Sequence, residues 1–336
     1  MKITTIGGKD YRLPSVLNDF QHEMYIHLID WKWAHITHEP GLNGGIYYDA
    51  ILPEAYPGQF PTLYPPVADA LRGHLRKYPF RIHKYFNHMA SSQAANLNLF
   101  LPILCHPKAN AILGALKPDF ARLATAELDH GFRIEFWDEP FGNLDDKTNV
   151  SGTDADIAIS YYNRQNELCL WLIEHKLTEK EFTECGGYRS EGRQPRHDCT
   201  KSFADILADK HICYYHDVRK FAYWTITETN HSFFPNHGNY RQCPFQGGMN
   251  QLWRNQLLAL SIEQDERQPY RQVSFSVVKH PRNIALDRTL SSYQELIAHN
   301  PKFSVFTSAD VLAAADQLGD EGLKPWITWY RNLYDI

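Results

Sequence analysis

The chain has 336 residues, of which 43% are hydrophobic and 13% are aromatic, so it can bury a substantial core. Its net charge of −5 is unlike the basic balance typical of nucleic-acid-binding domains, although a local basic channel beside an acidic site is compatible with a negative total. No apolar run reaches the roughly eighteen residues that span a membrane, and the first residues lack the apolar core of a signal peptide. We therefore expect a cytoplasmic protein with no membrane partner.

The N-terminal part of the sequence predicts helices joined by loops rich in proline and glycine. Residues 17–37 and 67–78 carry apolar side chains at helical spacing. A further helix begins after Ser91, whose hydroxyl is suited to cap it. We expect residues 1–80 to form a mostly helical extension packed on a main domain of residues 81–336, the two making one continuous globular unit.

A basic cluster lies in and after the second of these helices. It consists of Arg72, Arg76, Lys77, Arg81 and Lys84. Two interpretations stay open, a solvated helix face and a set of phosphate contacts.

Two polar positions inside apolar elements also have two interpretations. Gln93 and Asn96 are three residues apart in the predicted helix and can share a face, where they either satisfy buried groups or line a site. Glu135 alternates with apolar neighbours in a strand predicted over 132–137, so it lies either on a solvated face or in a site.

The later elements alternate between helices and strands. Helices are expected over 109–130 and 249–262, and strands over 223–227 and 272–278. Together with the central strands described next, the order is helix, strand, strand, strand, helix, strand. This order indicates an α/β fold in which helices flank a central mixed sheet.

Two strand-like runs at the centre of the chain carry the strongest functional signal. The first covers 156–162 and begins at Asp156, and the second covers 167–176 and ends in Glu174-His175-Lys176. Because side chains two apart share a face of a strand, Glu174 and Lys176 point the same way. If the runs pair as a hairpin, Asp156 reaches the same end.

The run before Glu174 is apolar on both faces, which indicates a central strand. Glu174 and Lys176 alone would be read as a surface ion pair. At the end of a buried strand, however, charged groups must be paired or bind a metal. Two carboxylates suited to a hard divalent cation, with a lysine beside them, outline a site for phosphodiester cleavage. Asp154 competes with Asp156 for the first carboxylate, and Asp156 is preferred because it directly starts the apolar run.

Several motifs occur together in a specific order. They are Ser91-Ser92-Gln93, Glu135, Thr153-Asp154-Ala155-Asp156, the run from Ile173 to Glu179, and the run from Gln251 to Ala259. Over about residues 88 to 285 the chain resembles the PD-(D/E)xK nuclease superfamily, and within it a bacterial group of restriction-endonuclease-like proteins. Ala155 stands where the superfamily usually has proline.

The resemblance implies a restriction-endonuclease-like core and a metal-dependent nuclease that hydrolyses DNA, in defence against foreign DNA or in repair. It implies that Asp156 and Glu174 hold Mg²⁺ or Mn²⁺, with a backbone carbonyl near His175 as a third ligand. Lys176 would orient the attacking water and offset transition-state charge, and Glu135 would add a second carboxylate. The substrate-contacting residues would be Gln93, Gln251 and Arg254.

Other interpretations of the whole protein remain open. The chain could be a catalytically silent DNA-binding or assembly subunit on the same fold, or a strand-cutting subunit of a transposon type. The negative charge favours a homodimer or a partner protein that supplies DNA affinity.

Four cysteines follow the second central strand. They are Cys185, Cys199, Cys213 and Cys243, separated by 14, 14 and 30 residues with no C-x-x-C pair. They are read either as four unrelated buried cysteines or as ligands of Zn²⁺ or of an iron–sulfur cluster, which some members of the superfamily carry. Nearby histidines offer further zinc ligands, namely His197, His216, His231 and His237.

Overall fold

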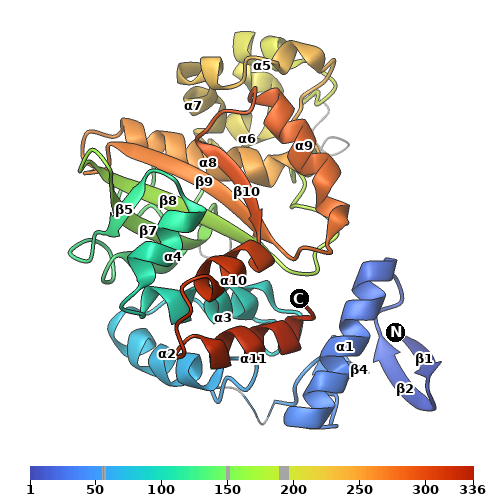
Figure 1. The fold of residues 1–336 in the computed structure, drawn as a ribbon. Helices are drawn as coiled ribbons and strands as arrows, with labels where there is room; N and C mark the ends of the chain where they lie inside the picture. Colours follow the sequence, from blue (N-terminus) through green and yellow to red (C-terminus); the bar gives the residue numbers. More distant parts are fainter. Residues whose placement is uncertain (55, 57, 149–151, 189–196) are drawn as a thin grey trace.

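The computed structural model describes residues 1–54, 56, 58–148, 152–188 and 197–336, and its centre is a six-stranded mixed sheet. Its strands are β5 (Phe120–Leu123), β6 (Phe132–Phe136), β7 (Ala155–Asn163), β8 (Leu168–Lys176), β9 (Gln272–Lys279) and β10 (Phe303–Thr307). Strands β8, β9 and β10 are parallel, and β7 pairs antiparallel with β8, β5 and β6. The predicted α/β fold with a central mixed sheet is confirmed, and β8 is a central strand as expected (Figure 1).

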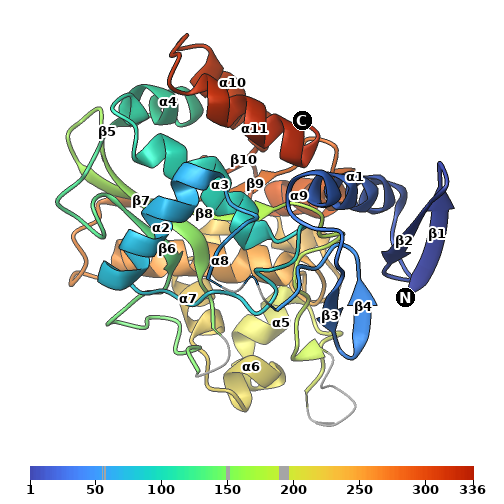
Figure 2. The same cartoon turned by 90° about the horizontal axis from the view of Figure 1, so that it is seen from below.

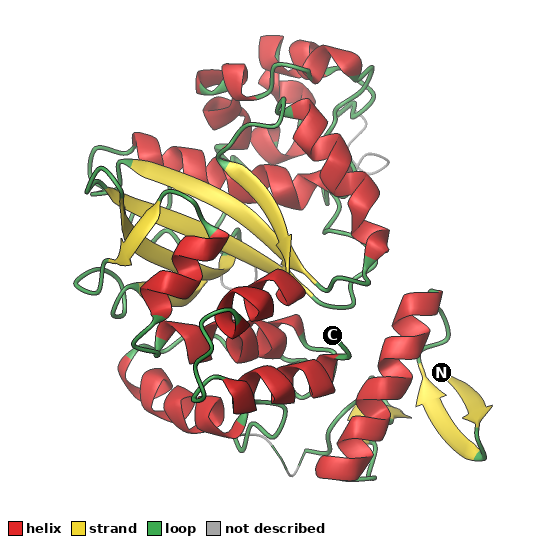
Figure 3. Ribbon diagram, viewed as in Figure 1, coloured by secondary structure: helices red, strands yellow, loops and turns green. Residues whose placement is uncertain are grey.

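Helices cover both faces of this sheet (Figure 3). One face packs against α2 (Pro65–Lys77), α3 (Ser92–Leu104), α4 (Ala109–Leu116), α10 (Ser308–Asp316) and α11 (Lys324–Tyr334). The other packs against α5 (Phe203–Ala208), α7 (Tyr223–Thr229), α8 (Met249–Gln264) and α9 (Asp287–Leu296), with α6 (Tyr214–Asp217) beside them. None of the helices in the described ranges has the length and apolar character that crossing a membrane requires.

The N-terminal segment adds a small unit to one side of the molecule (Figure 2). It contains β1 (Lys2–Ile6), β2 (Lys9–Leu13), α1 (Asp19–His35), β3 (Gly41–Asn43) and β4 (Ile46–Tyr48). A reciprocal cap between Asn18 and Gln21 begins α1. Met24 and Leu28 of this helix are buried in the core that lies over the sheet. The segment therefore shares a core with the rest of the chain, while the division at residue 80 stays a prediction.

The long helix expected over 109–130 is wrong beyond Leu116. Helix α4 ends at Leu116, and the chain then forms β5. Lys117 precedes Pro118, and the ring of a proline disfavours helical backbone in the residue before it. The apolar periodicity continued past this break because the residues of β5 are also packed against the core.

The strand expected over 223–227 is also wrong, because these residues form α7. Aromatic and β-branched residues favour strands on a half-buried surface, but Tyr223, Trp224 and Thr227 are all buried here. Trp224 packs against Trp253 of α8, with ring centroids 5.3 Å apart. Tertiary packing of one helical face has overridden the local preference.

Candidate active site

Three carboxylates lie in one row across neighbouring strands of the sheet. The pairing of β6 with β7 on either side of Glu135 puts this residue level with Asp156. The pairing of β7 with β8 runs through Ile157 and Ile173, so Asp156 is in turn level with Glu174. The predicted hairpin is therefore confirmed, and its register brings the two expected carboxylates to one end. Residues level on adjacent strands are direct neighbours, which makes Glu135 a third member of the group.

Glu174 is held by three donors. Its Oε1 accepts hydrogen bonds from Gln251 Nε2 at 2.7 Å and is 2.8 Å from Lys176 Nζ, while Oε2 accepts one from Asn255 Nδ2 at 3.1 Å. Gln251 and Asn255 are four residues apart on α8 and so share a helix face. Only 5% of Glu174 is exposed. A carboxylate has about four lone-pair positions, so Oε2 keeps acceptor capacity for a cation.

Lys176 remains a cation in this setting. It is 8% exposed, and its amine lies beside Glu174. Burial alone lowers the pKa of Lys176, but Glu174, Glu179 and Asp156 outweigh burial and raise the pKa above its ordinary value. The amine is therefore a fixed positive charge and a hydrogen-bond donor, and it is unsuited to act as a base near neutral pH.

Asp156 is fixed by backbone contacts on both sides. Its Oδ2 accepts a 2.6 Å hydrogen bond from the backbone N–H of His175 on β8. Its own carbonyl accepts one from Asn96 of α3 at 3.2 Å. Burial and the neighbouring charges of Glu174 and Glu135 raise the pKa of Asp156 well above its ordinary value, against opposing effects of Lys176 and the His175 amide. This carboxylate therefore carries unrelieved electrostatic repulsion when ionised.

Glu135 has an uncommon backbone conformation. Its φ is +51°, in the left-handed region that residues with a side chain rarely adopt and that costs energy to hold. Burial and the charges of Asp154 and Glu174 raise the pKa of Glu135 to about 8, against a hydrogen bond from Gln93. Gln93 is itself anchored, since it donates to the Arg81 carbonyl and accepts from the amide of residue 83. The predicted neighbours Gln93 and Glu135 are thus in contact.

Asp154 lies at the same end of β7. Burial and the charge of Glu174 raise the pKa of Asp154 to about 6, while Arg254 opposes the rise. Asp154 and Asp156 both line the cavity described next. Asp156 alone of the two is level with Glu135 and Glu174 in the strand pairing, which agrees with the preference for it.

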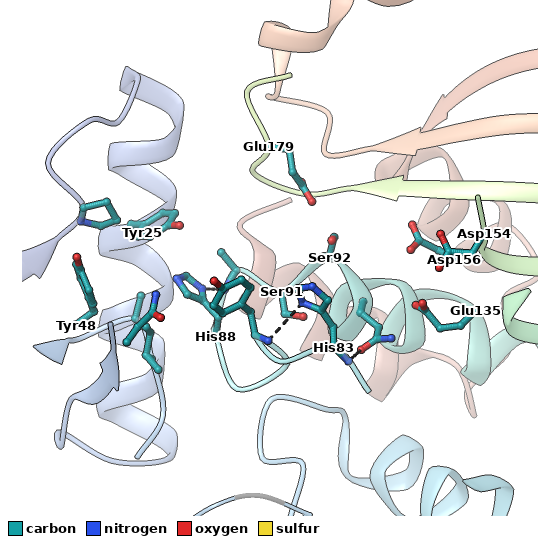
Figure 4. A pocket seen from close by; sticks show the side chains of 17 residues that line it. Tyr25, Tyr48, His83, His88, Ser91, Ser92, Glu135, Asp154, Asp156 and Glu179 are labelled. Carbon is teal, nitrogen blue, oxygen red and sulfur yellow. Dashed lines mark hydrogen bonds between the residues drawn. The ribbon is translucent and has the colours of Figure 1, made fainter. Parts of the chain in front are cut away.

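A cavity of about 580 Å³ opens onto these carboxylates. In Figure 4, Glu135, Asp154 and Asp156 gather at one end of it, and Tyr25 and Tyr48 of the N-terminal segment lie at the other. The capped first turn of α3 lines the space between them. A helix N-terminus favours negatively charged groups, so this wall suits a phosphate.

Comparison with known families agrees with this geometry. The family model described as "Restriction Endonuclease associating with ARP" matches residues 31–335. The chain belongs to this family. No curated protein and no solved structure matches it. Membership of this family agrees with the observed α/β core, while the finer resemblance to the PD-(D/E)xK superfamily and the roles of the carboxylates stay predictions.

The structure brings together most of the residues that were predicted for the site of this endonuclease family member. On α8, Asn255 joins the group although it was not predicted. Glu135, Asp156, Glu174 and Lys176 form one group, which Gln93 and Gln251 contact. Arg254 lies beside Tyr223 and Tyr215, which raise the pKa of its guanidinium against the opposing effect of burial, and its charge also lowers the pKa of Asp154. Sequence reasoning overlooked two members.

The overlooked members are Asn255 and Glu179. Asn255 contacts Glu174, and its spacing of four from Gln251 was the available signal. Glu179 lines the cavity and lies beyond the end of β8, where alternation along the strand no longer predicts direction.

The donor set of the site fits a hard divalent cation. Mg²⁺ prefers carboxylate oxygens and retains several waters, and a cation would relieve the repulsion that raises the pKa values of Glu135 and Asp156. Among the described residues, no three His, Cys, Asp or Glu side chains are already arranged as a metal site. Binding would therefore require small rotations of these carboxylates.

Proposed function

We propose that this chain is a metal-dependent endonuclease that hydrolyses DNA phosphodiester bonds. The observation that carries the proposal is the row of Glu135, Asp156 and Glu174 across three strands, with Lys176 bound to Glu174 and a cavity opening beside it. Acidic oxygens next to a permanent ammonium are the groups that metal-assisted phosphoryl transfer uses. Membership of a family described as a restriction endonuclease supports the same reaction class.

Each side chain has a distinct part in this proposal. Asp156 and Glu174 would hold Mg²⁺ or Mn²⁺, with Glu135 as an outer carboxylate or a ligand of a second ion. The bound metal would polarise the phosphate and lower the pKa of a bound water. Lys176 donates a hydrogen bond and offsets the negative charge that builds up on the phosphate. Gln251 and Asn255 fix Glu174 so that its position does not depend on the metal.

A second cavity, of about 490 Å³, supports DNA as the substrate. Glu135 lines both cavities, and the second is also lined by Lys77, Arg81, Arg133 and Lys147. Only Lys77 and Arg81 come from the basic cluster of the sequence. Arg133 pairs with Asp129 and Lys147 with Glu139, two carboxylates that line the same cavity, so a phosphate would compete with these pairs. Basic side chains beside the acidic row would hold phosphates on either side of the scissile bond.

A partner protein fits the charge of the chain. The net charge is −5, and the basic cavity is local. The family description names association with ARP, and we propose that such a partner contributes part of the affinity for DNA. A homodimer would serve the same purpose.

A silent assembly subunit is the second candidate. Glu174 favours it, because its three donors make it a satisfied member of an internal network and it does not line the main cavity. In an active nuclease the carboxylates would bind metal and the protein would cleave DNA, whereas in a silent subunit they would not.

A cleavage assay distinguishes the two candidates. The purified chain is incubated with plasmid, single-stranded DNA and RNA in Mg²⁺, Mn²⁺ or chelator. We expect cleavage that needs the metal. Asp156→Asn and Lys176→Gln should each lower the rate by about 1,000-fold or more, since each removes a charge that acts on the transition state.

Asp145→Asn is the matched control for Asp156→Asn. Asp145 is exposed, and its φ of +53° is one that asparagine tolerates well. This variant should cleave at the wild-type rate. Full cleavage by Asp156→Asn would contradict the mechanism. If the wild-type chain does not cleave DNA, alone or with a partner protein, the silent subunit is favoured.

A further inference from the structure

Four cysteines that are far apart in the sequence gather around one small cavity. Cys185, Cys199, Cys213 and Cys243 all line a space of about 20 Å³ on the α8 side of the sheet. All six cysteines lie in the described part of the chain, and all are free of disulfides. The remaining two lie elsewhere, Cys105 at the end of α3 and Cys169 in β8. The rest of the lining is mainly apolar and aromatic, including Ile206, Trp224, Phe245 and Trp253.

Backbone N–H groups point at three of the sulfurs in a repeated pattern. The amide of Tyr188 donates to Cys185 Sγ at 3.4 Å. Cys213 faces the amides two and three residues after it, those of Tyr215 and His216. Cys243 faces the amide of Phe245, again two residues on. A neutral thiol is a weak acceptor, whereas a thiolate gains substantially from such donors. The backbone is therefore arranged for negatively charged sulfur.

Without a cation, negatively charged sulfur is strongly disfavoured in this cavity. Burial raises the pKa of the Cys185 thiol to about 11 and that of Cys243 well above its ordinary value. The other three cysteines raise the pKa of Cys243 further, which places each of them within electrostatic reach of Cys243. A metal ion removes both penalties, because it replaces the protons and neutralises the thiolates.

The free space and the ligand set both suit a single ion. A space of about 20 Å³ is enough for one ion without displacement of the surrounding side chains. Four sulfur ligands around a single ion are the typical set of structural Zn²⁺. The four predicted histidine ligands are not among the residues that line this cavity; His197 bonds to Asp217 at 2.9 Å, and His237 stacks on Phe203.

We propose that Cys185, Cys199, Cys213 and Cys243 bind one structural Zn²⁺. Among the described residues no metal-binding group is already in ligand geometry, so rotation of the thiols into the cavity completes the site. This proposal does not rest on nuclease activity.

The position of the site explains what the ion would do. Residues 177–248 connect β8 to α8, and their described α-helices, α5, α6 and α7, have six, four and seven residues. Helices this short are not stable alone. Cys185 lies soon after β8 and Cys243 just before α8, the two elements on which Glu174 and Gln251 meet. The ion would cross-link this connection near the carboxylate row.

Metal content of the full-length chain tests the proposal. The protein is expressed with added zinc, purified without chelator, and assayed for zinc and iron by mass spectrometry. We expect about one zinc per chain, released by a mercurial thiol reagent. Cobalt bound in its place should show thiolate-to-metal charge-transfer absorption.

Cys213→Ser should lower the zinc content at least about 10-fold, and Cys105→Ser, a matched change outside the cavity, should leave it unaltered. If Cys213→Ser does not fold, zinc release and cobalt absorption of the wild-type chain still decide the matter. Zinc below about one-tenth per chain with no cobalt absorption would overturn the proposal. Iron with sulfide and a broad visible absorption would overturn it in favour of a cluster.

Discussion

The three carboxylates of the row stand on neighbouring strands of one sheet, whereas the four cysteines come from separate segments joined by helices of four to seven residues. Strand pairing positions the carboxylates by itself, through the backbone hydrogen bonds of the residues next to them on each strand. The cysteine segments have no such ladder. The acidic row is therefore assembled without a metal, whereas the proposed thiol site would depend on zinc for its order. The comparison predicts that removing each metal has a different structural effect.

The largest expected effect is on the connection between β8 and α8. Stripping zinc with a strong chelator should lower the local stability of α5 and α7 by about 4 kcal/mol or more, because the ion binds only the folded arrangement. Hydrogen exchange followed by mass spectrometry should show faster exchange there and little change in β7 and β8. Removing Mg²⁺ alone is the control and should leave both regions protected. Equal loss of protection in the β8–α8 connection and in β7 and β8 would show that the two sites do not differ in their dependence on metal.

Glu174→Ala is expected to have the next largest effect. It leaves the buried Lys176 amine without its ion-pair partner, and it removes the carboxylate that accepts hydrogen bonds from the side-chain amides of Gln251 and Asn255. Breaking a buried pair in this way costs about 3 kcal/mol of unfolding free energy, measured by urea denaturation. Glu321→Ala breaks an exposed pair with Lys324 and should cost less than about 1 kcal/mol. Similar costs for the two variants would mean that the Glu174 network adds no stability.

Glu135 should make stability depend on pH in the metal-free protein. Its pKa is about 8 when folded against 4.5 ordinarily, so the folded state retains a proton that the unfolded chain releases. The free energy of unfolding therefore falls as pH rises from about 4.5 to about 8. Glu135→Gln should remove about 1–2 kcal/mol of that fall, a value reduced because the side chain is partly solvated.

Urea denaturation in chelator at pH 5 and pH 8 measures this difference. Glu266→Gln, a change at an exposed glutamate, should leave the pH dependence as in the wild type. A pH dependence unaltered by Glu135→Gln would show that this carboxyl ionises normally.

The smallest effects are expected at the basic cavity. Lys77→Gln and Arg81→Gln should each weaken DNA binding by about 0.5–1 kcal/mol and reduce the slope of log affinity against log salt by about 1. Arg76→Gln on the same helix lies outside the cavity and should change less. Binding titrations of a cleavage-deficient variant at several salt concentrations measure this. Equal effects at all three positions would mean that the contact with DNA extends beyond the cavity.

The local pattern of the sequence was enough to predict the central position of β8 and, provided that the two runs pair, the hairpin of β7 and β8, whereas the approach of Gln251 on α8 was implied by the family resemblance. Alternation along a strand and periodicity along a helix are properties of neighbouring residues. They place Glu174 beside Lys176 and Asp156 at the same end without knowledge of the rest of the fold. The same reasoning failed for 223–227, where burial of one helical face decided the structure.

Tertiary structure alone decided three further features of this protein. The register of β6 made Glu135 level with Asp156, the rotation of α8 put Asn255 on Glu174, and the packing of the β8–α8 connection brought four cysteines to one cavity. Each depends on contacts between residues far apart in the chain. Local propensity carries no information about such contacts, because many registers and packings are compatible with the same periodicity.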